Sequence, residues 1–227
     1  MIRKSVFALP GGILALCFIF PLLAASGTGE VFRENFDAVK VGSIPEGWRV
    51  DETRGRGKPA EWRVVSEGAG SPRAHVLHVF PRKNASGGTF NLCWTDTVSF
   101  LDGEIKVLLK AGGGSEDQGG GPMWRVRDGR NYYVARYNPL ENNFRLYKVS
   151  AGMRTMLKGA SGISIPAGQW FSIRIIQKGR KIQCFLDGKK YIETEDDTFL
   201  SSGGVGLWSK ADAATSFDAL SVEAAGR

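Results

Sequence analysis

Few side chains in this 227-residue chain are suited to acid–base or nucleophilic chemistry. The two histidines, His75 and His78, stand three positions apart in an apolar, strand-like run. Residues three apart on a strand face opposite sides of a sheet, so we do not expect them to share a metal ion or a cleft. The sequence has no His-Glu-x-x-His, Gly-x-Ser-x-Gly or phosphate-binding Gly-Lys-Ser/Thr motif. It therefore disfavours zinc hydrolases, serine hydrolases and P-loop nucleotidases of those motif types.

Carboxylates are a second possible basis for catalysis, because glycoside hydrolysis uses two carboxyl groups about 5–9 Å apart. Asp117 and Glu141 are candidates, but nothing in the sequence shows that the two carboxyl groups lie close together in the fold. The acidic residues 193–197 follow a predicted hairpin strand and are predicted to form a loop. The sequence thus assigns no catalytic residue and no metal ligand. Calcium stays open as a cofactor, because its loop Asp and Asn ligands follow no fixed spacing here.

A sugar-binding surface needs only an aromatic face and a few planar polar groups. The segment 122–138 supplies both kinds of group as two predicted strands joined by a turn. Strand alternation places Met123 with Arg125 and Arg127, and Tyr132 with Val134, Arg136 and Asn138. Five residues are the predicted ligand-binding set: Arg125, Arg127, Tyr132, Arg136 and Asn138. Trp94, Trp208 and Lys210 are candidates for its edge. In the alternative interpretation, the arginines lie on a solvated sheet face and the tryptophans in the core.

Short apolar or alternating runs recur about every ten residues, which is typical of a β-sandwich or barrel. The predicted strands are 61–66, 75–80, 89–94, 102–110, 122–127, 132–137, 143–149, 170–177, 181–186, 204–209 and 215–222. Ile105, Val107 and Leu109 share one face of their strand. Asp-Gly pairs at 128–129 and 187–188 predict tight hairpins.

Composition supports a folded domain, with 42% hydrophobic and 23% charged residues. The 30 glycines are about 13% of the chain, nearly twice ordinary usage, and fit a turn-rich β protein. The net charge is +7. The basic stretches could contact an acidic polymer or lie in solvated loops. No recognition motif for nucleic acid is present, and we expect no nucleic-acid partner.

The N-terminus predicts export. Arg3 and Lys4 precede a run without charge from position 5 to 25, with small residues at 24–26. We predict a signal peptide over 1–26, a single domain over 27–227, and a periplasmic or extracellular location with no membrane span after cleavage. An uncleaved membrane anchor is the alternative. Two cysteines then remain, Cys93 and Cys184, as either a disulfide or two buried thiols.

Three groups of motifs occur in a characteristic order. They are 34–37 with 44–48, then 124–127 with 131–133 and 144–148, and finally Trp170 with 185–189, 204–208 and 217–218. In this order the chain resembles the concanavalin A-like lectin/glucanase (laminin-G-like) superfamily. Within it, the chain is most similar to the bacterial 3-keto-disaccharide hydrolase domain family. The resemblance implies an all-β, antiparallel two-sheet jelly-roll sandwich.

The chain departs from the active relatives in two motifs. It lacks the Glu-x-Asp-x-x-Glu strand of the sandwich glucanases, and Arg125 follows glycines instead of the Asn-Ser-Gly usual in the hydrolase family. We therefore expect an exported monomer that binds a glycan on its concave sheet. The alternatives are a hydrolase acting on 3-keto-disaccharides or related sugars, and a laminin-G-like structural or adhesion module. Because fold does not give function, the residues of the site must decide among them.

Overall fold

The computed structural model describes Met1 and residues 31–56, 58–68, 73–81 and 87–226. The regular structure in these ranges consists of strands, and none of it is helical. Accordingly, these ranges contain no helix of the length and apolarity needed to cross a membrane. The predicted signal peptide, apart from Met1, lies outside the described residues.

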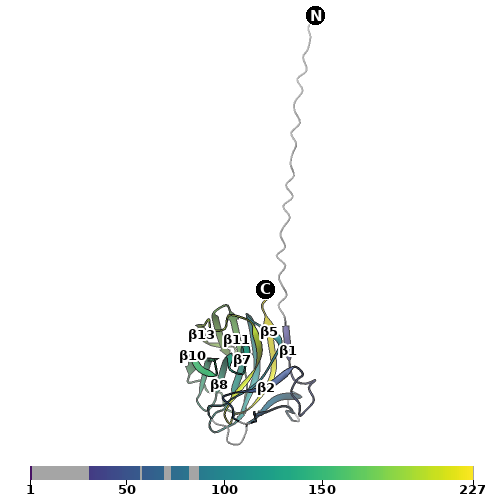
Figure 1. Cartoon of the computed structure of the whole chain (residues 1–227), viewed down its shortest axis with the longest axis vertical. Coiled ribbons are helices and arrows are strands. Elements are labelled where there is room, and N and C mark those ends of the chain that lie inside the picture. The colour runs from purple at the N-terminus through teal and green to yellow at the C-terminus, as the bar shows by residue number, and fades with distance from the viewer. Residues whose placement is uncertain (2–30, 57, 69–72, 82–86, 227) are drawn as a thin grey trace.

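The described strands form two antiparallel sheets packed face to face, the predicted jelly-roll sandwich (Figure 1). The eight-stranded sheet has the order β13 (Lys189–Glu195), β12 (Lys181–Leu186), β11 (Trp170–Lys178), β6 (Gly103–Gly113), β15 (Ala214–Ala224), β4 (His75–Phe80) and β3 (Glu61–Ser66), with β1 (Val31–Glu34) also paired to β15. The seven-stranded sheet has the order β10 (Met153–Ser161), β9 (Asn143–Ser150), β8 (Asn131–Asn138), β7 (Gly120–Asp128), β14 (Gly203–Lys210), β5 (Phe90–Phe100) and β2 (Trp48–Thr53).

The predicted strands are present, and four further strands, β1, β2, β10 and β13, were not predicted. The prediction of a loop for the acidic residues was wrong for Glu193 and Glu195, which lie in β13. The Asp187-Gly188 turn sends the chain straight back along β12, so backbone pairing makes a strand of a polar segment. Charged residues are tolerated there because β13 is an edge strand.

The main core lies between the two sheets. Ile105, Val107 and Leu109 of β6 are fully buried, as the alternation predicted. Cys93 and Cys184 contribute to this core from opposite sheets as free thiols. Of the two alternatives for the cysteines, separate buried thiols is therefore the correct one. Burial raises the pKa of both thiols, so they are packing residues and poor nucleophiles.

The seven-stranded sheet buries a second apolar cluster on the face turned away from that core. Its members are at most 5% exposed: Phe90, Leu92, Trp94, Met123, Val126, Tyr132, Val134, Tyr147, Val149 and Trp208. The end of β2 closes over one end of this face, where Thr53 Oγ1 donates to Gly129 O at 2.6 Å and Arg54 Nε to Gly152 O at 2.8 Å. Because β2 and β9 stand near opposite edges of the sheet, these contacts require the sheet to curl. This inward-curved side is hereafter the concave face.

Candidate functional site

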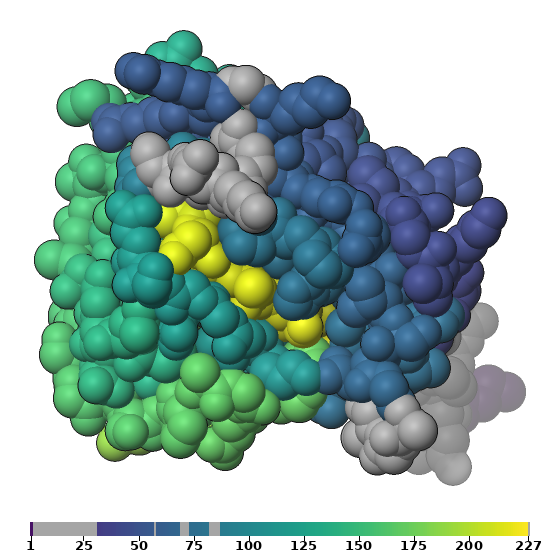
Figure 2. Space-filling view, turned by 90° about the horizontal axis from the view of Figure 1, so that it is seen from below, coloured from purple at the N-terminus to yellow at the C-terminus, as the bar shows by residue number. Residues whose placement is uncertain are grey.

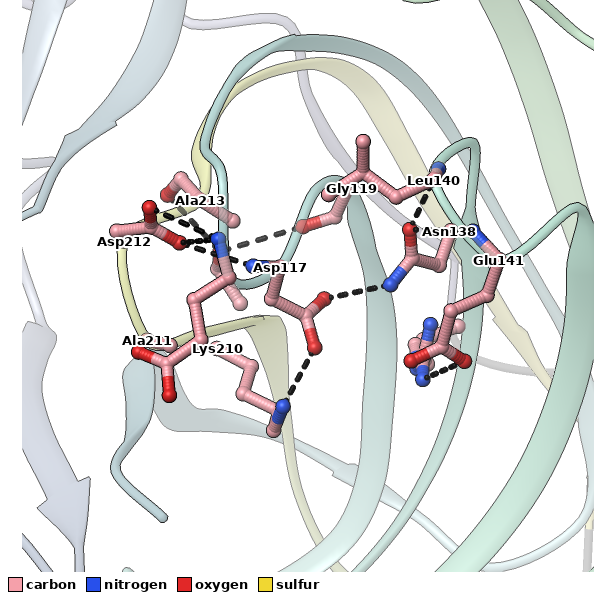
Figure 3. Close-up of polar contacts among 12 residues, drawn as sticks. Asp117, Gly119, Asn138, Leu140, Glu141, Lys210, Ala211, Asp212 and Ala213 are labelled. Carbon is pink, nitrogen blue, oxygen red and sulfur yellow. Dashed lines mark hydrogen bonds and ion pairs between the residues drawn. The ribbon is translucent and has the colours of Figure 1, made fainter. Parts of the chain in front are cut away.

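The loop that joins β6 to β7 carries Asp117 to the end of the concave face away from Thr53 and Gly129. Asp212, in the turn between β14 and β15, accepts hydrogen bonds from the backbone N–H groups of residues 115, 116 and 117 at 2.6, 3.0 and 2.9 Å (Figure 3). Burial acts to raise the pKa of Asp212, but these donors outweigh it and hold the pKa at about 2. Gly119 ends the loop with φ at +82°, where a Cβ would lie 2.2 Å from Tyr137 O. The loop is thus fixed before any ligand arrives.

Asp117 is a buried carboxylate, 1% exposed, with a donor on each oxygen. Its Oδ1 accepts from Asn138 Nδ2 at 2.9 Å and its Oδ2 from Lys210 Nζ at 2.6 Å (Figure 3). Asn138 is oriented by its own Oδ1, which accepts from Leu140 N at 2.9 Å. Burial raises the pKa of the Asp117 carboxyl, and the charges of Arg136 and Lys210 partly offset that effect.

Arg136 lies two residues before Asn138 on the same face of β8, and its side chain is 1% exposed. Its Nη2 donates to Glu141 Oε2 at 3.0 Å, whereas Nε and Nη1 have no hydrogen-bond partner in the described part of the chain. Glu141 is also held by Asn143 Nδ2 at 2.8 Å and Arg145 Nη1 at 3.2 Å. Burial acts to raise the pKa of Glu141, but the hydrogen bond from Asn143 and the charge of Arg136 lower it overall. Buried donors without acceptors are rare, and a bound acceptor is one explanation for them.

A fourth cation, Arg154 of β10, lies over the aromatic floor of the concave face. Its guanidinium carbon is 4.4 Å from the ring centroid of Tyr147 and 4.9 Å from that of Phe90, and its buried Nη1 has no partner among the described residues. Trp208 packs against Phe90 at 5.2 Å and donates its indole N–H to Tyr132 Oη at 3.2 Å. These rings form a closed floor beneath Arg154. Figure 2 shows a C-terminal segment, in yellow, at the bottom of a hollow between earlier segments in blue and teal.

The structure brings three of the five predicted binding residues to this face: Tyr132, Arg136 and Asn138. Tyr132 lies in the floor, with its Oη 2.7 Å from Thr53 Oγ1. Burial raises the pKa of its phenol, so Tyr132 stays neutral and acts as a packing and hydrogen-bonding group.

Arg125 does not share the face of Met123, and the expectation from alternation was wrong there. Its φ of +48° lies in a β-bulge where the β7–β8 register breaks, so Val126 packs beside Met123 instead. The Arg125 guanidinium turns toward the loops at one end of the sandwich. Its Nε, Nη1 and Nη2 donate to Leu101 O at 2.9 Å, Phe199 O at 2.5 Å, and both Asp102 Oδ1 and Gly179 O at 3.1 and 3.0 Å.

Arg127 lies near the same loops and is exposed. Its Nη2 donates to Ser201 Oγ at 2.9 Å, and its guanidinium carbon lies 5.2 Å from the Phe199 ring centroid. The bulge between Trp124 and Asp128 thus carries both arginines away from Arg136. Of the suggested edge residues, Lys210 pairs with Asp117, whereas Trp94 and Trp208 are buried in the floor.

Sequence reasoning missed three cluster residues, Asn143, Arg145 and Arg154, and also Asp212, which holds the neighbouring loop. Arg145 could have been found from its alternation with Tyr147 in β9, and Arg154 from its place in an unpredicted strand. Asp212 has no local signal, because its partners lie about 95 residues earlier in the chain. Hereafter, the polar cluster means Asp117, Arg136, Asn138, Glu141, Asn143, Arg145, Arg154 and Lys210.

Other candidate chemistry lies elsewhere. His78 Nδ1 is 2.9 Å from Ser216 Oγ in the eight-stranded sheet, and burial lowers the pKa of the imidazole. A cleft of about 510 Å³ on that sheet is lined by residues that include Arg33, Lys106 and Leu220. No group of three or more His, Cys, Asp or Glu side chains in the described ranges is placed to hold a metal ion.

Solved structures with this fold include carbohydrate-active proteins. The carbohydrate-binding module CBM66 from Bacillus subtilis is 19% identical, with a TM-score of 0.61 over 80% of this chain and 98% of that one. A Bacillus licheniformis beta-glucanase is 12% identical, with a TM-score of 0.58 over 86% and 98%. Domain 4 of the Geobacillus stearothermophilus GH43 arabinanase AbnA, solved with arabinotriose, is 12% identical, with a TM-score of 0.55 over 89% and 94%. At these identities the likeness establishes the concanavalin A-like fold alone.

Sequence comparison gives a closer relationship. Among curated proteins, none matches this chain. A family model does match it, from residue 32 to residue 223, which is most of the chain and nearly all of the described sandwich. The match confirms the family resemblance drawn from the motifs. The chain therefore belongs to the family of 3-keto-alpha-glucoside-1,2-lyase-like domains, the 3-keto-disaccharide hydrolase domain family.

Proposed function

We propose that this protein is an exported monomer that binds a carbohydrate at the polar cluster on its concave face. The observation that carries the proposal is Arg136, a 1%-exposed guanidinium whose Nε and Nη1 have no acceptor in the described part of the chain. A buried donor without a partner costs about 1–3 kcal/mol, and a ligand oxygen would recover that free energy. Sugar hydroxyl and carbonyl oxygens are suitable acceptors.

Several features of the polar cluster support a sugar as the ligand. Arg136, Asn138 and Asp117 are planar polar groups held in place by their neighbours, which is the chemistry that orients hydroxyl groups. The fold neighbours include a carbohydrate-binding module and a domain that holds arabinotriose. The uncharged N-terminal run supports export into a compartment where glycans are found.

Cleavage of a 3-keto glycoside is the second candidate function, and the two carboxyl groups favour it. The pKa of Asp117 is raised and that of Glu141 is lowered, so Asp117 is the more basic of the two carboxylates and the candidate base. A ketone at C3 of a sugar acidifies the C2 proton. A base could then take that proton while the C1–O bond breaks and a C1=C2 double bond forms, with a second group protonating the leaving oxygen. Arg136 would stabilise the charge that develops on the ketone oxygen.

Calorimetric titration of the protein with neutral and acidic oligosaccharides and a 3-keto-glucoside tests the binding proposal. We expect one sugar class to bind and Arg136→Gln to weaken it at least tenfold, because the variant loses the charged donors at the centre of the cluster. Arg127→Gln is the matched control, since Arg127 lies outside the cluster, and it should bind as the wild type does. Binding by no sugar would refute the proposal and favour the adhesion-module alternative.

Activity and export are separate measurements. A 3-keto-glucoside incubated with the protein should release its aglycone, and Glu141→Gln or Asp117→Asn should reduce the rate at least a hundredfold if these groups transfer protons. Sugar binding without release would leave the binding function and reject the enzymatic one. Mass spectrometry of exported protein should show a chain that begins at Gly27, whereas a full-length membrane-bound chain would indicate the uncleaved anchor.

A further inference from the structure

We propose that the sugar recognised at the polar cluster carries an anionic group, a carboxylate or a sulfate ester; this inference rests on the proposed function and specifies its ligand. Four cationic side chains belong to the cluster: Arg136, Arg145, Arg154 and Lys210. Two carboxylates, Asp117 and Glu141, lie among them. Even with Asp212 counted, cations outnumber carboxylates.

The carboxylates are already neutralised without Arg154. Lys210 and Asn138 occupy the two oxygens of Asp117, and Glu141 is held by Arg136, Arg145 and Asn143. Asp212 is occupied by the backbone N–H groups of its loop. Arg154 has no ion pair with any of these groups in the described ranges, and its guanidinium rests on aromatic rings instead.

The positive charge that no described carboxylate neutralises lies close to buried N–H groups that have no described acceptor. Among the described residues, the buried Nε and Nη1 of Arg136 and the buried Nη1 of Arg154 have no hydrogen-bond acceptor. Burial lowers the pKa of Arg154, and the charge of Arg136 lowers it further while Asp117 and Glu141 act to raise it, so these charged groups lie within electrostatic reach of Arg154. A neutral sugar would satisfy the donors but would leave the repulsion between the two guanidinium groups in place. An anionic group would accept hydrogen bonds from these donors and would also offset the repulsion between the two guanidinium groups.

Matched sugar pairs that differ in one charge test this inference. The wild-type protein is titrated with methyl glucuronide against methyl glucoside, trigalacturonate against its carboxyl-reduced trimer, and glucose 6-sulfate against glucose. We expect the acidic member of at least one pair to bind tenfold or more tightly, with a preference that falls between 50 and 500 mM NaCl because charge attraction is screened. Binding confined to the uronates or to the sulfate ester identifies the anion.

Two variants make the result specific to this site. Arg154→Gln should reduce the ratio of acidic-member to neutral-member affinity at least fivefold, because it removes one charge partner of the anion. Arg174→Gln, which removes a cation paired with Glu104 on the other sheet, should leave the preference intact. Equal or tighter binding of the neutral twins overturns the anionic ligand but keeps the proposed carbohydrate-binding function. No binding by either member of any pair overturns the function itself, and the two failures are thereby distinguishable.

Discussion

Arg125 and Arg136 occupy neighbouring strands of one sheet, and each is 1% exposed, yet their environments are opposite. Arg125 donates four hydrogen bonds, three of them to backbone carbonyl oxygens in separate loops. Arg136 has one ion pair and two nitrogen atoms without a partner in the described ranges. Burial alone therefore does not distinguish a structural arginine from a ligand-binding one. The count of satisfied donors does, because only the second arginine gains free energy when an acceptor arrives.

The largest effect should come from Arg125→Met. The variant removes the Arg125 donors from the carbonyl groups of Leu101 and Phe199 and one of two donors from that of Gly179, which keeps Gln177 Nε2. We expect the free energy of unfolding to fall by about 3–5 kcal/mol. Urea denaturation of the variant and the wild type measures this difference in the free energy of unfolding. Arg127→Met should change stability by less than about 0.5 kcal/mol, since that side chain is exposed. A loss at Arg125 as small as that at Arg127 would contradict the structural role.

Lys210→Met tests whether the polar cluster also contains a structural pair. Asp117 would keep Asn138 but lose its counter-ion, so we expect a loss of about 2–3 kcal/mol at pH 7. Burial already raises the pKa of Asp117, and the substitution should raise it further. A raised folded-state pKa destabilises the ionised form, so the deficit should shrink as the pH falls and Asp117 becomes protonated. A deficit that stays constant from pH 7 to pH 4 would rule out this pairing.

Asp212→Asn should have a smaller effect, about 1 kcal/mol, because asparagine keeps one acceptor for the loop N–H groups. The folded-state pKa of Asp212 is about 2, below the ordinary value of 3.8. Its contribution is therefore present above pH 4 and is lost as the pH falls toward 2. Stability measured across this range should decline less steeply in the variant than in the wild type. An unchanged slope would mean that Asp212 does not hold the loop in solution.

The smallest effect on stability should come from Arg136→Met, within about 0.5 kcal/mol of the wild type or slightly stabilising. The substitution removes two buried nitrogen atoms that have no partner within the described part of the chain, and Glu141 retains Arg145 and Asn143. Thermal unfolding without ligand measures the change, and titration should show the loss of sugar binding in the same variant. Destabilisation comparable with that of Arg125→Met would remove the contrast between the two arginines.

Where apolar and polar residues alternate regularly along a strand, the sequence pattern correctly predicted which side chains are buried. In β6 and β11 the apolar residues that alternate in sequence all point into the main core, and the Asp-Gly pairs form the predicted hairpins. The same reasoning failed at Arg125, because one bulged residue with a positive φ reverses the alternation that follows it. It also failed at β13, where pairing to β12 overrides a polar composition.

The amino-acid sequence was enough to predict the all-β class, most of the strands, the family, and the face of β8 that carries Arg136 and Asn138. These features depend on residues within one strand or one turn, where side-chain direction follows from position. The three-dimensional fold was needed to show that Asp117 pairs with Lys210, 93 residues later in the chain, and that Asp212 fixes the loop between β6 and β7. Those contacts depend on how strands distant in sequence pair and on how the sheet curls, and no local spacing encodes either.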